Sequence, residues 1–168
     1  MTASRLYREH GIEGIGIQKL SKTVGLTHGG FYKQFPDGKG QLMAEAVALM
    51  FDEYHDLLSR PTTLESVIDR YLSAEHRNSV QGGCPVPILS PDVSRNKNSL
   101  GNVYDHGIKR MLKLLMSKPD DRQNTMDEER AMQLLASMAG ALMIAKAVND
   151  ETLSQRFLAA TRHLWGLE

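Results

Sequence analysis

The sequence predicts an all-α fold, with a three-helix helix-turn-helix domain at the N-terminus and a helical domain after it. Apolar residues recur at helical spacing in nearly every segment of the 168 residues, and no segment shows a convincing alternation of apolar and polar residues. There is no Asn-Gly hairpin and no internal repeat. The expected helices cover residues 2–10, 17–24, 28–34, 39–59, 63–79, 85–94, 97–117, 126–148 and 151–166.

Segment 17–24 is expected to form a short amphipathic helix that ends in a turn. Ile17, Leu20 and Val24 stand at positions i, i+3 and i+7 and form one apolar face. Gly25 follows the last of them, where a left-handed residue commonly ends a helix and where glycine carries no Cβ penalty. Leu26 is then expected to be buried in the turn.

Segment 28–34 is the second helix of this motif. Thr27 can cap it, because a threonine hydroxyl accepts a hydrogen bond from a backbone N–H two or three residues further on. Phe31 and Phe35 are four residues apart on one side and are expected to face inward. The opposite side presents small or polar residues, which are His28, Gly29, Tyr32 and Lys33. Such a surface can enter the major groove of DNA closely.

The segments that follow are mostly longer helices separated by breaks. Segment 39–59 is long enough to connect the helix-turn-helix to a second domain, and Pro61 ends it. Residues 82–85, which read Gly-Gly-Cys-Pro, mark a break. We expect Pro87 and Pro91 to make the next helix short or distorted, because an interior proline removes a helix hydrogen bond.

The last two expected helices are rich in apolar residues. Residues 131–148 hold six Ala and one Gly, with Leu, Met, Ile and Val distributed nearly all round the helix. A helix that is apolar on every face must be covered on every face. The cover can come from a second subunit or from the other helices of one subunit, and these residues leave both open. The next helix adds candidates for the same contact, which are Phe157, Leu158, Leu164 and Trp165.

Composition and charge limit the class of protein. Lys and Arg balance Asp and Glu at 20 each, but residues 1–44 hold six basic against three acidic residues, a modest asymmetry that favours nucleic acid at that end. A single cysteine, Cys84, allows no intramolecular disulfide, and residues 1–16 lack the apolar core of a signal peptide. The most apolar run, 134–145, is too short to span a membrane. We therefore expect a soluble, cytoplasmic protein.

The sequence carries no catalytic motif in a recognisable setting. There is no nucleophile elbow, phosphate loop or carboxylate dyad. The six histidines lack the i, i+4 spacing of a helical metal pair, and no second cysteine supports zinc. We expect neither an enzyme nor a metal or cofactor site. Cys84 is a candidate either for a redox sensor or for a small buried apolar group.

The N-terminal part of the chain resembles a known family. The runs 3–11, 17–25 and 26–35, followed by Lys39 and Leu42, closely resemble the N-terminal DNA-binding domain of TetR-family transcriptional regulators. A fainter likeness extends to two later stretches and resembles one branch of that family, with a Gly-Cys-Pro break in the C-terminal domain. Those stretches are residues 71–77 and 83–86.

This resemblance implies a DNA-binding transcriptional regulator, specifically a repressor released from a palindromic operator by a small-molecule effector. It implies a helix-turn-helix DNA-binding domain over residues 1–44 and a helical effector-binding and dimerisation domain over residues 45–168. Because members of the family dimerise through their last two helices, it also implies a homodimer through residues 126–166. The alternative is a helical ligand-binding protein or enzyme in which the helix-turn-helix is only a packing element.

The resemblance also assigns roles to individual residues. Tyr32, Lys39 and the N-terminal end of the helix that contains Gln18 should contact phosphates. The residues nearest to base edges should be Thr27, His28, Gly29 and Lys33. Residues 36–38 make the turn before Lys39 one residue longer than in many members, and we still expect Lys39 to reach a phosphate. The effector is expected among helices 39–59, 63–79, 97–117 and 126–148, with its identity and pocket residues open.

Overall fold

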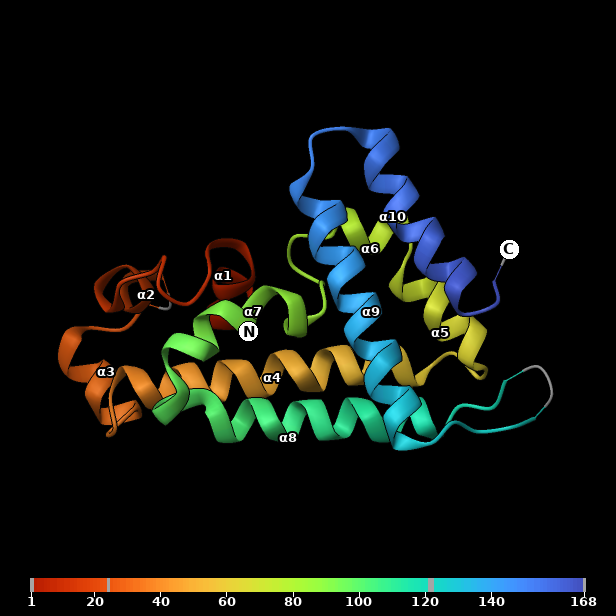
Figure 1. Cartoon of the computed structure of the whole chain (residues 1–168). Helices are drawn as coiled ribbons and strands as arrows, with labels where there is room; N and C mark the ends of the chain where they lie inside the picture. Colours follow the sequence, from red (N-terminus) through yellow and green to blue (C-terminus); the bar gives the residue numbers. More distant parts are fainter. Residues whose placement is uncertain (1, 24, 121–122, 168) are drawn as a thin grey trace. The chain divides into compact units, whose positions relative to one another are not determined.

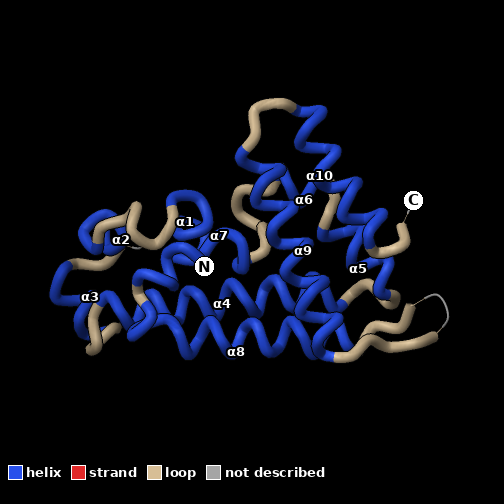
Figure 2. The backbone as a smooth tube through the Cα atoms, in the orientation of Figure 1, coloured by secondary structure: helices blue, strands red, loops and turns tan. Residues whose placement is uncertain are grey.

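The computed structural model describes residues 2–23, 25–120 and 123–167, and within these residues every regular element is a helix (Figures 1 and 2). The predicted all-α class is therefore confirmed. The helices are α1 (Thr2–His10), α2 (Ile17–Thr23), α3 (His28–Gln34), α4 (Lys39–Ser59), α5 (Leu64–Tyr71), α6 (Ala74–Asn78), α7 (Pro85–Arg95), α8 (Lys97–Met116), α9 (Glu128–Ala147) and α10 (Glu151–Leu164).

Contacts divide the chain into two compact units. The first contains Met1–Glu53 and Val80–Gly107, and the second contains Tyr54–Ser79 and Ile108–Glu168. Helices α4 and α8 therefore each contribute to both units. This division by contacts differs from the functional division at residue 44 that the sequence suggests, and the latter stays a prediction.

In the first unit, α1 packs against α7 and α2 against α3. The N-terminal part of α8 runs parallel to that of α4, because Gly40 lies near Ser99 and Phe51 lies against Tyr104 further along both helices. Gly107 permits this close approach, since a Cβ there would lie 2.4 Å from the Phe51 ring. Cys84 is fully buried in this unit, which favours a packing role over that of an exposed redox thiol.

In the second unit, α10 packs along α9, and α6 also contacts α9 (Figure 1). Polar side chains join these helices. Arg77 of α6 donates to Glu151 and Ser154 of α10, with N–O distances of 2.8 and 2.9 Å. Arg162 near the end of α10 donates to Asp69 of α5 at 2.6 Å. These contacts hold one side of α10 against α5 and α6 and leave its other side outward.

The single helix predicted over residues 63–79 is wrong, because the structure breaks it into α5 and α6. Ser73 leaves helical geometry at φ −79° and ψ 154° and accepts a hydrogen bond from the backbone N–H of His76 at 3.0 Å. Its hydroxyl also donates to the carbonyl oxygen of Arg70 at 3.0 Å. Serine can offer the backbone these alternatives to helix bonds, and here they start a new helix.

The prolines of α7 do not shorten that helix, which extends for 11 residues through Pro91. Pro85 and Pro87 lie in its first turn, where the backbone N–H groups have no partner within the helix, so a proline costs little there.

Among the residues that the structure describes, no helix is long and apolar enough to cross a bilayer.

Candidate DNA interface

The turn between α2 and α3 has the geometry that its sequence predicts. Gly25 has φ +72°, the left-handed conformation that favours glycine. Its N–H donates to the carbonyl oxygen of Lys22 at 3.2 Å, and the N–H of Leu26 donates to that of Ser21 at 2.9 Å. This pair of hydrogen bonds is the Schellman motif, which ends α2 sharply and sets the direction of the next helix. Leu26 is half-buried rather than fully buried.

Two predictions for this region cannot be compared in full with the structure. Val24, the third apolar residue of the expected α2 face, lies outside the described residues, and so do the side chains of Ile17 and His28. Leu20, the remaining member of that face, is completely buried, as expected.

Helix α3 begins at the predicted cap. The hydroxyl oxygen of Thr27 accepts a hydrogen bond from the backbone N–H of Gly30 at 3.1 Å. Phe31 and Phe35 are 1% and 8% exposed, and their ring centroids lie 5.2 Å apart. The two rings therefore fix α3 on the core by one face, and the prediction that they face inward is confirmed.

The other face of α3 is open to solvent. Gly29 and Lys33 are exposed, and Tyr32 is 46% exposed while its ring meets that of Phe31 edge-on. A Cβ added to Gly29 would meet no atom within 4 Å, so the surface is low at this point. Thr27 is also exposed, and its hydroxyl keeps a hydrogen to donate while its oxygen caps the helix.

Three further cations lie on the exposed surface of these elements. Lys39 is the first residue of α4 and is half-exposed after a turn that contains Gly38 at φ +71°. The positive charge of its ammonium group therefore adds to the partial positive charge at the N-terminus of α4, and the two together attract phosphate. Lys19 and Lys22 of α2 are exposed as well, as is Gln18. The two lysines were not among the predicted contacts, although their exclusion from the apolar face was a usable signal.

Two buried side chains, which the sequence reasoning missed, hold these elements in place. Arg8 of α1 donates to a carboxylate oxygen of Glu53 at 2.7 Å and to the carbonyl oxygen of Met50 at 3.2 Å. Asp92 of α7 accepts the backbone N–H of Ile12 at 2.7 Å. These partners are 42 to 80 residues apart in the sequence, and no local pattern marks them.

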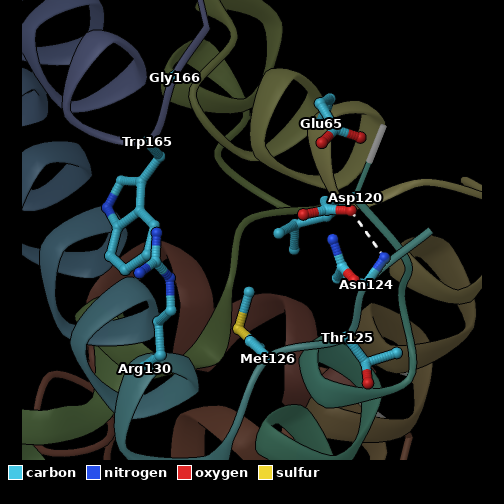
Figure 3. A pocket seen from close by; sticks show the side chains of 9 residues that line it. Glu65, Asp120, Asn124, Thr125, Met126, Arg130, Trp165 and Gly166 are labelled. Atoms are coloured by element: carbon cyan, nitrogen blue, oxygen red, sulfur yellow. Dashed lines mark hydrogen bonds between the residues drawn. The ribbon is translucent and has the colours of Figure 1, made fainter. Parts of the chain in front are cut away.

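The second unit contains a cavity of about 570 Å³ (Figure 3). On one side the Arg130 guanidinium lies 5.4 Å from the centroid of the Trp165 ring, whose N–H donates to Ser137 at 2.9 Å. On the other side the Asp120 carboxylate accepts the backbone N–H of Asn124 at 2.8 Å. The lining residues are Leu64, Glu65, Asp120, Asn124, Thr125, Met126, Arg130, Trp165 and Gly166.

Both α9 and α10 carry a stripe of apolar residues on their outward sides. On each helix the stripe follows helical spacing, and exposed polar residues lie beside it, among them Gln133 and Lys146 on α9 and Arg156 on α10. The stripes consist of Met132, Ala136, Gly140, Met143 and Ala147 on α9, and of Leu153, Phe157, Ala160 and Leu164 on α10. The opposite side of α9 is buried within the unit and includes Leu134, Leu135, Met138 and Ala141.

The chain was compared with known proteins first by sequence. No protein-family model matches the chain. An uncharacterized HTH-type transcriptional regulator of Mycobacterium tuberculosis, found in strains H37Rv and CDC 1551, is 24% identical over 170 residues, which cover 90% of this chain and 84% of the relative.

Two solved structures are similar over nearly the whole chain. The reduced form of Escherichia coli NemR superposes with a TM-score of 0.80 at 22% identity, covering 98% of this chain and 91% of that one. A transcriptional regulator of the TetR family from Cytophaga hutchinsonii superposes with a TM-score of 0.77 at 18% identity, covering 99% and 91%. The chain therefore has the fold of a TetR-family regulator.

Proposed function

We propose that this protein is a TetR-family transcriptional regulator that binds a palindromic operator as a homodimer and represses transcription until a small-molecule effector releases it. The observation that carries the proposal is the division of α3 into two faces. Phe31 and Phe35 fix one face on the core, while the other is exposed, polar and low at Gly29. Most surface helices expose polar residues, but the low surface at Gly29 also lets a base edge approach the backbone of α3 near its N-terminus. The M. tuberculosis relatives, which are named as HTH-type regulators, support the same function.

The contacts with DNA divide into two kinds. Phosphates are held by Lys39, by Tyr32 and by the N-terminal end of α2 at Gln18. Lys39 and α2 flank α3, Tyr32 lies on its exposed side, and the three supply a cation, a phenol and the first backbone N–H groups of a helix. Base edges are read by the exposed residues Thr27, Gly29 and Lys33. His28, the first residue of α3, is proposed to read them as well. Thr27 fits either a base or a phosphate acceptor, since its hydroxyl hydrogen remains available.

The homodimer is proposed to form through residues 126–166. The apolar stripes of α9 and α10 together would give a two-helix face, and a second copy related by a two-fold axis presents the same face in return. The small residues Ala136 and Gly140 allow the two copies of α9 to approach closely. Two-fold symmetry of the protein then matches the symmetry of a palindromic operator, whose half-sites lie about 34–36 Å apart.

For the effector we propose the cavity beside Trp165. Its volume of about 570 Å³ is in the range of small-molecule sites, and it combines an aromatic ring and Met126 with several polar groups. Its walls come from α5, the loop before α9, the start of α9 and the residues after α10, and they include parts of two of the four segments expected from the sequence. A ligand there changes operator affinity only through its differential affinity for two arrangements of the dimer, and operator must weaken ligand binding by the same factor.

Operator binding is tested with DNA that flanks the protein's own gene, in fluorescence anisotropy and gel-shift titrations against scrambled DNA of equal length. We expect saturable binding of one dimer that exceeds binding to scrambled DNA by about 10³-fold or more. Equal affinity for both DNAs across the flanking region would favour the alternative, a helical ligand-binding protein or enzyme in which the helix-turn-helix is a packing element.

The effector site is tested with Trp165, the only tryptophan in the chain. Ligands found by thermal-shift screening should change its fluorescence, and a cavity-filling Met126→Trp variant, followed by calorimetry, should no longer bind them. A ligand that binds without altering the Trp165 signal or operator affinity would contradict this assignment.

A further inference from the structure

The side chain of Asp92 is buried and forms a hydrogen bond with the N-terminal part of the chain. Asp92 is 6% exposed, near the C-terminal end of α7, and its Oδ2 atom accepts the backbone N–H of Ile12 at 2.7 Å. Its Oδ1 atom accepts a hydrogen bond from Arg95 at 2.7 Å. Hydrogen bonds to an ionised acceptor are short and strong. The bond between Ile12 and Asp92 joins residues 80 positions apart in the sequence and lies at the turn that follows α1.

Neighbouring residues leave room for this contact and add a second one beside it. A Cβ on Gly11 would lie 3.0 Å from Asp92 Oδ2, so a side chain at position 11 would crowd the carboxylate. One residue beyond Ile12, the Glu13 carboxylate accepts the side-chain amide of Asn96 at 2.7 Å, and the same amide donates to the carbonyl oxygen of Asp92 at 3.0 Å. The end of α7 therefore holds the turn after α1 by two neighbouring hydrogen bonds.

This turn leads directly into α2 and α3. On its other side, α1 is held to α4 by Arg8, which bonds Glu53 and the carbonyl oxygen of Met50. The chain thus enters the helix-turn-helix from a segment that is fixed twice, once by α4 and once by α7. Ile12 and Ile15 are also fully buried, so packing contributes to the position of residues 11–16 beside the hydrogen bonds from α7.

We propose that Asp92 is a positioning residue for operator binding, which fixes the turn of residues 11–16 and through it the orientation of α2 and α3. The inference rests on the proposed function and adds to it a residue that does not touch DNA. If the helix-turn-helix has the correct orientation only for a fraction of the time, the apparent dissociation constant rises by the inverse of that fraction. A dimer needs both copies in place, so a threefold loss in each copy weakens operator binding about ninefold.

The experiment compares Asp92→Ala, Asp92→Asn and Arg95→Gln with the wild type in the full-length dimer. Asp92→Ala removes the acceptor, Asp92→Asn keeps an oxygen that can accept the Ile12 N–H, and Arg95→Gln removes the cation while leaving that contact intact. Operator affinity is measured by anisotropy at a temperature where circular dichroism shows each variant folded, over a series of salt concentrations. Hydrogen exchange of the Ile12 amide reports the contact directly.

We expect Asp92→Ala to weaken operator binding by about tenfold with an unchanged salt slope, because no phosphate contact is removed. Its Ile12 amide should exchange faster. Asp92→Asn should recover affinity to within about threefold of wild type and Arg95→Gln to within about twofold. The proposal is overturned if Asp92→Ala binds operator like wild type while its Ile12 amide exchanges faster. It is equally overturned if Asp92→Asn, folded and with its Ile12 amide protected, binds as weakly as Asp92→Ala.

Failure of the proposed function would look different. In that case the wild type itself would not distinguish operator from scrambled DNA, whatever the exchange rate at Ile12. Should Asp92→Ala fail to fold, the comparison of Asp92→Asn with Arg95→Gln still decides, because loss of affinity in a folded Arg95→Gln with the Ile12 contact retained would assign the effect to the ion pair and overturn the proposal.

Discussion

The Nδ1 atom of His76 lies 2.6 Å from the carbonyl oxygen of Tyr71, across the break between α5 and α6. The His76 ring stacks on that of Tyr54, with centroids 5.4 Å apart, and meets the Tyr71 ring edge-on. Burial lowers the pKa of His76 from 6.5 to about 4, and the hydrogen bond to Tyr71 opposes this while the charges of Lys146 and Arg70 add to it. The neutral ring can donate its Nδ1–H to Tyr71 and so close the end of α5.

The first prediction is a loss of stability in mild acid. Because the folded state binds the His76 proton with a pKa of about 4 and the unfolded chain with a pKa near 6.5, only the unfolded chain gains a proton as pH falls through this window. The unfolding free energy should therefore fall by about 2 kcal/mol between pH 7.5 and pH 5 because of this one group. Urea denaturation at both pH values measures it.

The control for this prediction is His76→Gln, which should be less stable at pH 7.5 but should lack this part of the pH dependence. If wild type and His76→Gln lose the same free energy between pH 7.5 and pH 5, His76 does not titrate in this window.

A second prediction concerns Gly29, where stability and DNA binding should change in opposite directions. Gly29 is helical and a Cβ there would meet no atom within 4 Å, so Gly29→Ala should leave the fold intact and stabilise it by up to about 1 kcal/mol. The same methyl group would stand between α3 and the base edges. We expect operator affinity to fall about tenfold or more, because the loss of binding free energy should be that of an overpacked contact.

Gly101→Ala is the matched control, because Gly101 is also helical, in α8, with no atom within 4 Å of an added Cβ. It should raise the melting temperature to a similar extent and leave operator affinity unchanged. Unaltered operator affinity in Gly29→Ala would show that α3 does not approach DNA at this residue.

Helix ends that depend on one residue and its near neighbours could be predicted from the sequence. Thr27 caps α3, Gly25 ends α2 and Pro85 begins α7, since each acts through its own backbone geometry or a hydrogen bond within a few residues. The break at Ser73 could not be predicted in this way. A serine inside an apolar helical pattern is compatible with one continuous helix, and the buried His76 ring that accompanies the break is a tertiary feature.

In the candidate site, too, features set by nearby residues could be predicted from the sequence, and contacts between distant residues could not. The exposed face of α3 follows from the four-residue spacing of Phe31 and Phe35, which the sequence displays. The hydrogen bond from Ile12 to Asp92 has no such signal, because it joins a backbone N–H to a side chain 80 residues away. The all-round apolar character of residues 131–148 indicated burial but not which side of the helix is covered within one subunit.

The third prediction separates phosphate contacts from base contacts. Lys39→Ala should weaken binding to operator and scrambled DNA alike and reduce the salt slope by about one unit, because one counterion fewer is released. Lys33→Ala should instead also relax the preference for operator over scrambled DNA. Titrations at several salt concentrations measure both quantities. A Lys39→Ala variant with wild-type affinity and salt slope would contradict the phosphate assignment of Lys39.

The last prediction tests the homodimer on the outward face of α9. Met143 is 50% exposed, so Met143→Glu should leave a single subunit folded, whereas Ala141, 6% exposed, faces the interior and Ala141→Glu should unfold it. In a two-fold dimer the carboxylates that Met143→Glu introduces in both copies would be buried in one interface without partners, at a cost of several kcal/mol. Sedimentation should then show a helical monomer with little operator affinity, while Asn102→Glu, an exposed change of equal charge on α8, should stay dimeric. A dimeric Met143→Glu, or a wild type that is monomeric at micromolar concentration with operator DNA present, would show that α9 does not carry the interface.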